Sequence, residues 1–381
     1  MALSETFALP SSIDVNTPYF CERRSAPVRF SICIPQYNRT SHLLVQLAML
    51  DDQDCRDFEV CIADDRSPEN RSAEIVDFLQ QSTLNYAYLI NAENLRYDGN
   101  LRASISLARG DYCVLFGNDD CFVSKTSLSE LAKHLADHQY PEIALSNFAD
   151  YLDGTVTRRV LSTGILGQGV DVAVAHYRHL AFVSGVVINR ENAHRYASKE
   201  VDGSEMYQKY LACKILSAGG RLLAIDEVLV RKDIELPGEQ VDSFRTRPKI
   251  HPCPIQARHL PLTQLAQVIW TGIRENCPEN RASELSEKIL APLYSFTFPY
   301  WLIRYRNVQS WKYAVGLGLG MAPKYVAKTL PLRGLNLLRI RLRYAAMMVG
   351  GLLVPQKLFD IARPWLYKLA KRSTSATVAK R

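Results

Sequence analysis

The feature that most constrains the fold is an alternation of short apolar runs with amphipathic segments over the first 120 residues. Strand-like runs, rich in β-branched and aromatic side chains, occupy 29–34, 58–63, 86–91 and 112–116. Helix-like segments lie between them, at 40–50, 69–81 and 100–108. Strands that alternate with helices build right-handed βαβ units. The sequence therefore predicts an α/β fold with a mostly parallel sheet flanked by helices.

Further elements are expected along the chain. Strands are predicted at 143–148 and 182–189, and a helix at 204–217 that ends at Gly219 and Gly220. Thr40 is expected to cap the first helix.

Polar side chains cluster where the predicted strands end, at 35–39, 64–67, 94–100 and 118–120. Ligands of open α/β sheets bind beyond the carboxyl ends of the strands. The four clusters therefore predict one binding site at this edge of the sheet.

The chain, at 381 residues, is longer than a typical single domain. We expect a polar leader at 1–27, the α/β domain at 28–250 and a helical, basic region at 251–381. A proline-rich break at 248–261 separates the last two parts.

Charge is unevenly distributed. From Ala291 onward the chain has sixteen Lys and Arg and one acid, Asp360, a net charge of +15, so the rest carries −8. Cations interleaved with aromatic and aliphatic side chains indicate contact with an anionic membrane surface. A helical subdomain packed on the body is the alternative. Nucleic acid is disfavoured, because no RNA-binding motif is present.

A peripheral location on the cytoplasmic face of the plasma membrane is expected. The longest uncharged stretch near the C-terminus, 344–356, is too short to cross a bilayer, and no signal peptide precedes the body. Nine cysteines without a C-x-x-C pair are typical of reduced thiols in the cytosol.

Four motifs occur in an order that is more specific than any one of them. They are Pro35-Gln-Tyr37-Asn38-Arg39, Asp64-Asp65-Arg-Ser67, Gly110-Asp111-Tyr112 and Gly117-Asn118-Asp119-Asp120. Over residues 28–230 the chain thus resembles the family 2 glycosyltransferases of the GT-A fold. The resemblance implies a nucleotide-sugar donor site formed by Pro35, Tyr37, Asn38, Arg39, Asp64, Asp65, Gly99, Asn100 and Asp119.

Individual roles follow from the same resemblance. Tyr37 would pack against the nucleotide base, and Asp65 would accept its imide hydrogen. Asp120 would be the leading metal ligand, while Asp119 would contact the ribose or support the metal.

Chemistry gives an independent reason for an acidic pair at a strand end. A sugar diphosphate leaves as an anion, and Mg²⁺ or Mn²⁺ held by hard oxygen ligands neutralises the developing charge. A turn capped by Asp119 and Asp120, without any ligand, is the alternative.

Inverting transfer also needs a base that deprotonates the acceptor hydroxyl. The family places an acidic residue between a strand and the start of a helix, which corresponds to Asp202-Gly-Ser-Glu205 here. Glu205 is the first choice and Asp202 the second. In the alternative interpretation, Ser204 and Glu205 simply begin a helix.

Two positions depart from the family pattern. Gly117 stands where an acidic residue is common, and Arg96 stands where glycine is common. Arg96 and Arg102 are candidates for a phosphate contact, with a solvent-facing position as the alternative. His134, His138, His176 and His179 are interpreted as surface residues, since no third metal ligand accompanies them.

The resulting hypothesis is an inverting glycosyltransferase that adds a sugar to a lipid-linked saccharide in bacterial surface polysaccharide synthesis, such as O-antigen or capsule. A sugar nucleotidyltransferase is one alternative, although 35–39 lacks the glycine-rich loop of that class. A catalytically inactive membrane scaffold that retains the fold is the other. Sugar, base, linkage and oligomeric state are left open.

Overall fold

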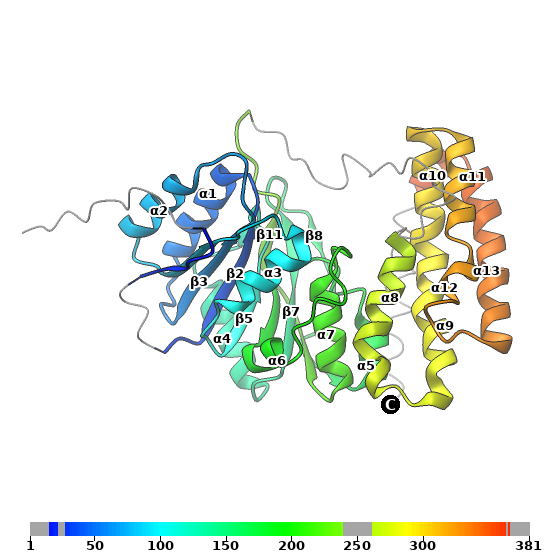
Figure 1. Ribbon diagram of the computed structural model, residues 1–381, viewed down its shortest axis with the longest axis horizontal. Coiled ribbons are helices and arrows are strands. Elements are labelled where there is room, and N and C mark those ends of the chain that lie inside the picture. The colour runs from blue at the N-terminus through cyan, green and yellow to red at the C-terminus, as the bar shows by residue number, and fades with distance from the viewer. Residues whose placement is uncertain (1–14, 22–26, 239–260, 363–364, 366–381) are drawn as a thin grey trace, which may run out of the picture.

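The computed structural model describes residues 15–21, 27–238, 261–362 and 365. One mixed sheet forms the body of the molecule, with helices on both faces (Figure 1). Its strand order is β1-β4-β3-β2-β5-β10-β7-β11-β6, with β8 paired to β7 and β9 paired to β11.

The first half of the sheet is parallel and contains the predicted βαβ units. Its strands are β2 (Phe30–Gln36), β3 (Phe58–Asp64), β4 (Asn85–Ile90) and β5 (Tyr112–Leu115). They are connected by α1 (Thr40–Asp51), α2 (Ser72–Gln81) and α3 (Arg96–Ser106). Phe30 pairs with Phe58 on one side and with Tyr112 on the other, so three strands are in register at their starts. The predicted α/β class is confirmed.

The second half brings antiparallel strands into the sheet. β10 (Val186–Asn189) runs antiparallel to both β5 and β7 (Ile143–Asp150), whereas β7 and β11 (Arg221–Lys232) are parallel. The short strands of the edges are β1 (Tyr19–Phe20), β6 (Cys121–Phe122), β8 (Val156–Thr157) and β9 (Gly164–Gln168).

Helix starts differ from those expected. The helices of the body after α3 are α4 (Ser127–Asp137), α5 (Val170–His176), α6 (Arg190–Arg195) and α7 (Tyr207–Ser217). Thr40 is not a cap but the first helical residue of α1. The carboxylate of Glu69 caps this helix instead, accepting the backbone N–H groups of Arg39 at 2.9 Å and Thr40 at 3.2 Å. A long-range carboxylate thus satisfies the free N–H groups that a local cap would otherwise take.

Two hydrophobic clusters cover the two faces of the sheet. One contains side chains of α1, α2 and α4. The other contains side chains of α3, α5, α6 and α7, and it continues without interruption into the C-terminal helices. His176, expected at the surface, lies in this second layer and is buried. Burial lowers the pKa of its imidazole to about 4.

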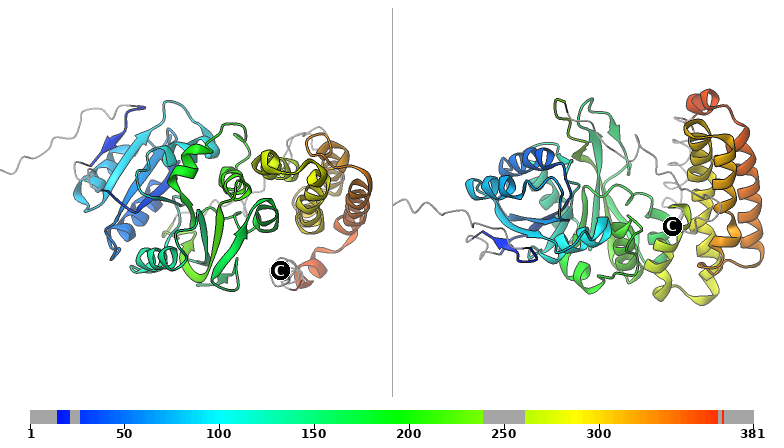
Figure 2. Two further views of the ribbon diagram at one scale, coloured as in Figure 1. Left: turned by 90° about the horizontal axis from the view of Figure 1, so that it is seen from below. Right: turned by 45° about the horizontal axis from the view of Figure 1, so that its top comes forward.

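The C-terminal region consists of helices that stack beside α5 and α7, at the opposite end of the molecule from α1 and α2 (Figures 1 and 2). They are α8 (Pro261–Ile273), α9 (Ala282–Pro292), α10 (Phe298–Val308), α11 (Trp311–Gly320), α12 (Pro323–Val326) and α13 (Gly334–Leu353). Short 3₁₀ turns precede α9 at Arg274–Asn276 and Glu279–Arg281, and a π-helical turn, Leu293–Thr297, joins α9 to α10. In the described ranges, no helix has the length and apolarity to span a bilayer.

The contact between body and C-terminal helices includes polar bonds as well as apolar packing. The hydroxyl of Tyr177 donates to the carbonyl of Ile289 at 2.9 Å. Arg281 makes two bonds of 2.7 Å to the carboxylate of Asp171. The expected boundary near residue 250 falls outside the described residues.

Candidate active site

Gln36, the last residue of β2, connects the loops at the carboxyl ends of three neighbouring strands. Its carbonyl accepts the backbone N–H of Asp65 at 2.8 Å and the amide of Asn100 at 3.0 Å. Its side chain accepts from Asn118 at 2.7 Å and donates to the carbonyl of Asn38 at 2.7 Å. The structure therefore brings together the predicted residues Asn38, Asp65 and Asn100. Gln36 was not predicted, although its place at the strand end between two motif residues is a usable signal.

The acidic pair after β3 is engaged within the protein. Asp64 accepts the hydroxyl of Tyr88 at 3.2 Å. One oxygen of Asp65, Oδ1, accepts the N–H of Leu95 at 2.6 Å and the amide of Asn91 at 3.1 Å. Burial raises the pKa of both carboxyl groups. Asp64 thus braces the strand end, and Asp65 holds the 94–96 loop through Oδ1.

The loop after β2 turns sharply towards the second acidic pair. Asn38 and Arg39 have left-handed backbone conformations, with φ of 52° and 56°. The turn directs Arg39 Nη1 to Asp119 Oδ2, with which it forms an ion pair. Tyr37, at the tip of this turn, is 46% exposed, so a ring face is free to receive a planar ligand. Pro35 lies within β2.

Asp120 is a buried carboxylate with two hydrogen-bond partners. Its Oδ1 accepts the backbone N–H of Asp233 at 2.9 Å, and its Oδ2 accepts the hydroxyl of Ser184. Burial, and then the charge of Asp119, raise its pKa well above the ordinary range. Burial likewise raises the pKa of Asp119, against the opposing effect of Arg39. A cation would relieve the repulsion between these two groups.

The glycine that departs from the family pattern has a steric explanation. A Cβ at Gly117 would lie 3.0 Å from Asp120 Oδ2 and 3.1 Å from Asp119 Oδ1. A side chain at 117 would therefore require these carboxylates to shift by a few tenths of an ångström, so glycine is the residue that leaves their arrangement undisturbed.

Gly110, at the start of the preceding motif, has a packing role away from the strand-end site. Its position immediately before β5 places a hypothetical Cβ only 2.6 Å from the backbone carbon of Phe30 in β2. The hydroxyl of Ser31 accepts the N–H of Gly110 at 2.9 Å. This motif residue therefore serves the close approach of β5 to β2.

Asp119 and Asp120 fit a divalent cation only with help from a ligand. Among the residues that the structure describes, no group of three or more His, Cys, Asp or Glu side chains is arranged to hold a metal. Mg²⁺ is commonly bound by one or two carboxylates together with substrate phosphates and water. The donor set is thus that of a site completed by a diphosphate.

Glu205 lies outside the helix that it was considered to begin. α7 begins at Tyr207, and Glu205 is exposed in a left-handed conformation with φ of 60°. Buried Asp98, which was not predicted, holds this loop. Its carboxylate accepts the N–H of Glu205 at 2.8 Å, the N–H of Tyr207 at 2.9 Å and the hydroxyl of Ser204 at 3.3 Å.

Asp202 is paired with a cation. Arg102 donates to its two oxygens at 2.6 and 2.7 Å and lies over the ring of Tyr207, 5.5 Å from its centre. Arg102 is therefore held by Asp202 rather than extended into solvent. Arg96, the second departure from the family pattern, is exposed and has φ of 59°, the left-handed region in which glycine is favoured.

Tyr97 connects the two acidic parts of the site. Burial raises the pKa of its phenol, and the charges of Asp98, Asp120 and Glu205 act in the same direction. Its hydroxyl donates to Gln208 at 3.4 Å. The candidate metal carboxylate and the candidate base are thus within electrostatic reach of one side chain, which the sequence did not single out.

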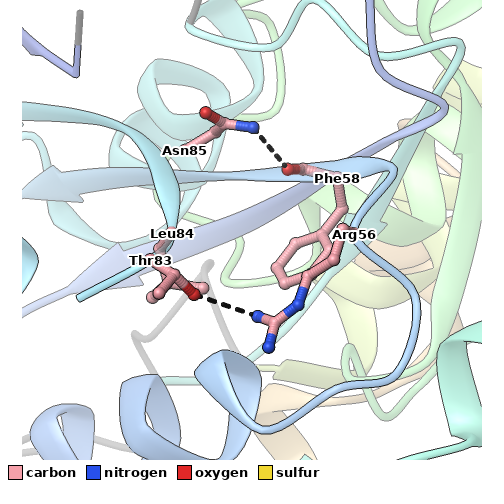
Figure 3. Close-up of a pocket in the computed structure, with 5 residues that line it drawn as sticks. All are labelled: Arg56, Phe58, Thr83, Leu84 and Asn85. Carbon is pink, nitrogen blue, oxygen red and sulfur yellow. Dashed lines mark hydrogen bonds between the residues drawn. The ribbon is translucent and has the colours of Figure 1, made fainter. Parts of the chain in front are cut away.

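Two hollows lie near the sheet. One, of about 440 Å³, is lined by Glu93, Leu95, Gly99, Arg102, Ala103, Ser106, Lys199 and Asp202, so Gly99 of α3 and Asp202 of the loop before α7 border the same hollow. The other, of about 410 Å³, is lined by Arg56, Phe58, Thr83, Leu84 and Asn85 (Figure 3). Phe58 and Asn85 begin β3 and β4, so this second hollow lies at the opposite end of the strands from the site.

Comparison with solved structures defines the class of the fold. The chain superposes on residues 1–349 of TarS from S. aureus with a TM-score of 0.55 and 14% identity, covering 84% of this chain and 89% of that one. A mannosyltransferase from Pyrobaculum calidifontis, solved with GDP-Man and Mn²⁺, gives a TM-score of 0.50 and 17% identity over 87% and 88%. The fold is that of the GT-A glycosyltransferases.

Sequence comparison finds a family match over part of the chain. Residues 31–199 match the model of glycosyl transferase family 2. It is 38% identical to the abequosyltransferase RfbV of Salmonella typhimurium over 28% of this chain and 32% of that protein. It is 28% identical to the amylovoran biosynthesis glycosyltransferase AmsB of Erwinia amylovora over 44% and 57%. The matches thus span about a third and somewhat more than half of these relatives.

Proposed function

We propose that the chain is an inverting glycosyltransferase that transfers a sugar from a nucleotide-sugar donor to a saccharide acceptor in bacterial surface polysaccharide synthesis. The observation that carries this proposal is the Asp119–Asp120 pair at the carboxyl end of β5, half-buried and buried respectively, joined to the loops of β2 and β3 through Arg39 and Gln36. Both curated relatives are named as glycosyltransferases, and one is named for the biosynthesis of amylovoran.

The donor would lie across the strand ends. Tyr37 offers an exposed ring for the base, and Asp65 Oδ2 an acceptor for a base N–H. Asp119 and Asp120 would hold Mg²⁺ or Mn²⁺, which when bound neutralises the charge of the leaving diphosphate. Structures of this fold are known with UDP-GlcNAc for TarS and with GDP-Man and Mn²⁺ for the mannosyltransferase.

The acceptor hydroxyl would be deprotonated by Glu205 as it attacks the anomeric carbon. Glu205 is the better choice than Asp202, because both Asp202 oxygens are bound to Arg102. Asp98 would keep Glu205 in place, and Tyr97 would lie between Glu205 and the metal carboxylates.

The acceptor is proposed to be lipid-linked, and the protein to act on the cytoplasmic face of the plasma membrane. The charge of +15 in the last 91 residues supports this location, because each cation near an anionic surface contributes about 1 kcal/mol.

Asp120→Asn tests the proposal. Asparagine keeps an acceptor for the N–H of Asp233 but lacks the charge that holds a cation. Transfer should fall at least about a hundredfold, since even indirect partners of a metal typically cost tenfold to a hundredfold when lost. Hydrolysis or transfer of a panel of nucleotide sugars with Mn²⁺, with and without EDTA, measures this.

Asp137→Asn, at the exposed end of α4, is the matched control, and melting temperatures establish that both variants fold. Full activity of Asp120→Asn, or of the wild type in excess EDTA, would contradict the metal role. If the wild type acts on no nucleotide sugar, the result would support the alternative of a catalytically inactive scaffold. Release of pyrophosphate from a nucleoside triphosphate and a sugar phosphate would indicate a nucleotidyltransferase.

A further inference from the structure

Helix α13 has two different faces. One is packed on the other C-terminal helices: Ile340 is fully buried, and Tyr344 donates its hydroxyl to the carbonyl of Gly318 at 3.0 Å. Gly351 lies so close to α10 that a Cβ would meet Leu302 at 2.8 Å. The opposite face, called the α13 outer face, consists of Leu335, Leu338, Leu342, Val349 and Leu353, each between 50 and 68% exposed.

The α13 outer face is a continuous stripe. Its members recur at three, four and seven residues, the spacing that keeps side chains on one side of a helix. In Figures 1 and 2, α13 belongs to the layer of helices farthest from the sheet. The stripe therefore lies at the outer side of the molecule, away from the body.

Cations flank the stripe on both sides. At 100° per residue, Arg339 and Arg343 fall along one side of it and Arg341 along the other. Arg339 lies 3.4 Å from Glu287, and Arg343 donates to Ser295 at 2.6 Å. Leucines bordered by arginines are the pattern of a helix that lies in the plane of a membrane interface.

The segment after α13 extends this surface. Residues 356–362 are helical, and Leu358, Ile361 and Trp365 are 57, 77 and 63% exposed. Lys357 lies among them. Tryptophan is favoured at the membrane interface, where its ring meets both apolar and polar surroundings.

We propose that the α13 outer face is the surface by which this protein docks on an anionic membrane, with its leucines at the boundary of headgroups and acyl chains. This deepens the proposed function, on which it rests for the membrane location. Charge complementarity favours lipid over a second copy of the chain. Two outer faces paired with each other would bring arginines together, and the only acid from Ala291 onward is Asp360.

The test is flotation of the full chain with vesicles of phosphatidylcholine alone, or of phosphatidylcholine with roughly 30% phosphatidylglycerol to supply a negative surface potential. The wild type should bind the anionic vesicles and release as salt rises. Leu338→Glu combined with Leu342→Glu should weaken binding at least about tenfold, since burial of each leucine contributes that much or more. Both positions are exposed, so the fold should tolerate the changes.

Leu152→Glu combined with Leu161→Glu is the matched control, because these leucines are 72 and 58% exposed on the body. It should bind as the wild type does. Melting temperature and stabilisation by nucleotide sugars should be unchanged in both double variants, which separates docking from donor binding. If nucleotide sugars stabilise the protein but it binds no vesicles, only the docking proposal is overturned. If it binds vesicles but no nucleotide sugar stabilises it, only the proposed transferase function is overturned.

Three results overturn the docking proposal. The first is that the wild type fails to bind anionic vesicles at low salt. The second is that both double variants bind the vesicles equally well. The third is that the wild type is a dimer and binds no vesicles, while the α13 double variant is a monomer and the control double variant stays a dimer. The last result would assign the face to a second copy.

Discussion

Individual carboxylates in this site are distinguished by their partners. Asp202 and Glu205 are three residues apart, and the sequence offered both as the base. Arg102 occupies both oxygens of Asp202, whereas Glu205 is exposed beyond the Asp98 anchor. The arrangement favours Glu205, because Arg102 already engages both oxygens of Asp202, the other candidate for the general base.

Glu205→Gln should reduce transfer by about 10² to 10⁴ while leaving donor affinity near normal, because glutamine keeps the shape but does not take a proton. Single-turnover transfer and donor titration by thermal shift measure the two effects. Asp202→Asn serves as the comparison and should cost at most about 1 kcal/mol of stability, since its pair with Arg102 is partly exposed. Unchanged transfer in Glu205→Gln, with loss in Asp202→Asn, would reverse the assignment.

The sequence predicted the site residues that stand in local motifs, and it missed those that contact the site from distant segments of the chain. Asn38, Asp65 and Asn100 stand in short motifs at strand ends, and the parallel sheet alone brings them together. Ser184 and Asp233 bind Asp120 from 64 and 113 residues away. They come from the antiparallel half of the sheet, whose pairing no local pattern specifies, so sequence reasoning did not find them.

At the scale of elements, the 198–206 loop and the start of α7 depend on a residue of another helix. Asp98 of α3 accepts backbone N–H groups of this loop and of α7, and burial raises the pKa of its carboxyl. The sequence placed the start of this helix at 204, because Ser204 and Glu205 are good first-turn residues. The structure starts it at Tyr207, where the N–H groups of Glu205 and Tyr207 are bound to Asp98 of another helix.

Asp98→Asn should lower kcat much more than it changes the donor KM, because an amide accepts fewer of these bonds and Glu205 loses its position. Loss of a charge-assisted bond should also cost about 1.5 to 3 kcal/mol of stability. Steady-state kinetics and thermal unfolding measure both. Tyr177→Phe, which removes a buried hydrogen bond far from the site, controls for lost stability alone. Equal kinetic effects in the two variants would leave Asp98 without a positioning role.

The molecule as a whole is held together by one continuous hydrophobic cluster that reaches from the sheet to Ile340. Gly272 of α8 marks the contact with α7, because a Cβ there would lie 2.9 Å from Cys213 Cβ and 3.0 Å from the carbonyl of Tyr210. The sequence showed the charge and apolarity of this region but left its partner open. An apolar helical face can pack against protein or against lipid, so the sequence pattern does not identify its partner. The structure shows that the inner faces of the C-terminal helices pack against the body.

Gly272→Ala should lower the free energy of unfolding by about 1 to 3 kcal/mol, because the α7–α8 contact must widen. Gly350→Ala, on α13 where a Cβ meets nothing within 4 Å, is the matched control and should stabilise by about 0.4 to 1 kcal/mol. Denaturant unfolding of both variants measures this. A Gly272→Ala protein as stable as the wild type would mean that the two helices are not closely packed.

The close fit of α8 on α7 also limits how such enzymes exchange parts. A hybrid that joins this catalytic half to the tail of a relative would set a foreign helix against Tyr210 and Cys213, where there is room only for glycine. Recombination within 239–260 should therefore give the more stable proteins when the donor of the tail supplies a glycine at the position of Gly272. The body and the C-terminal helices would then be inherited as matched pairs rather than as interchangeable modules.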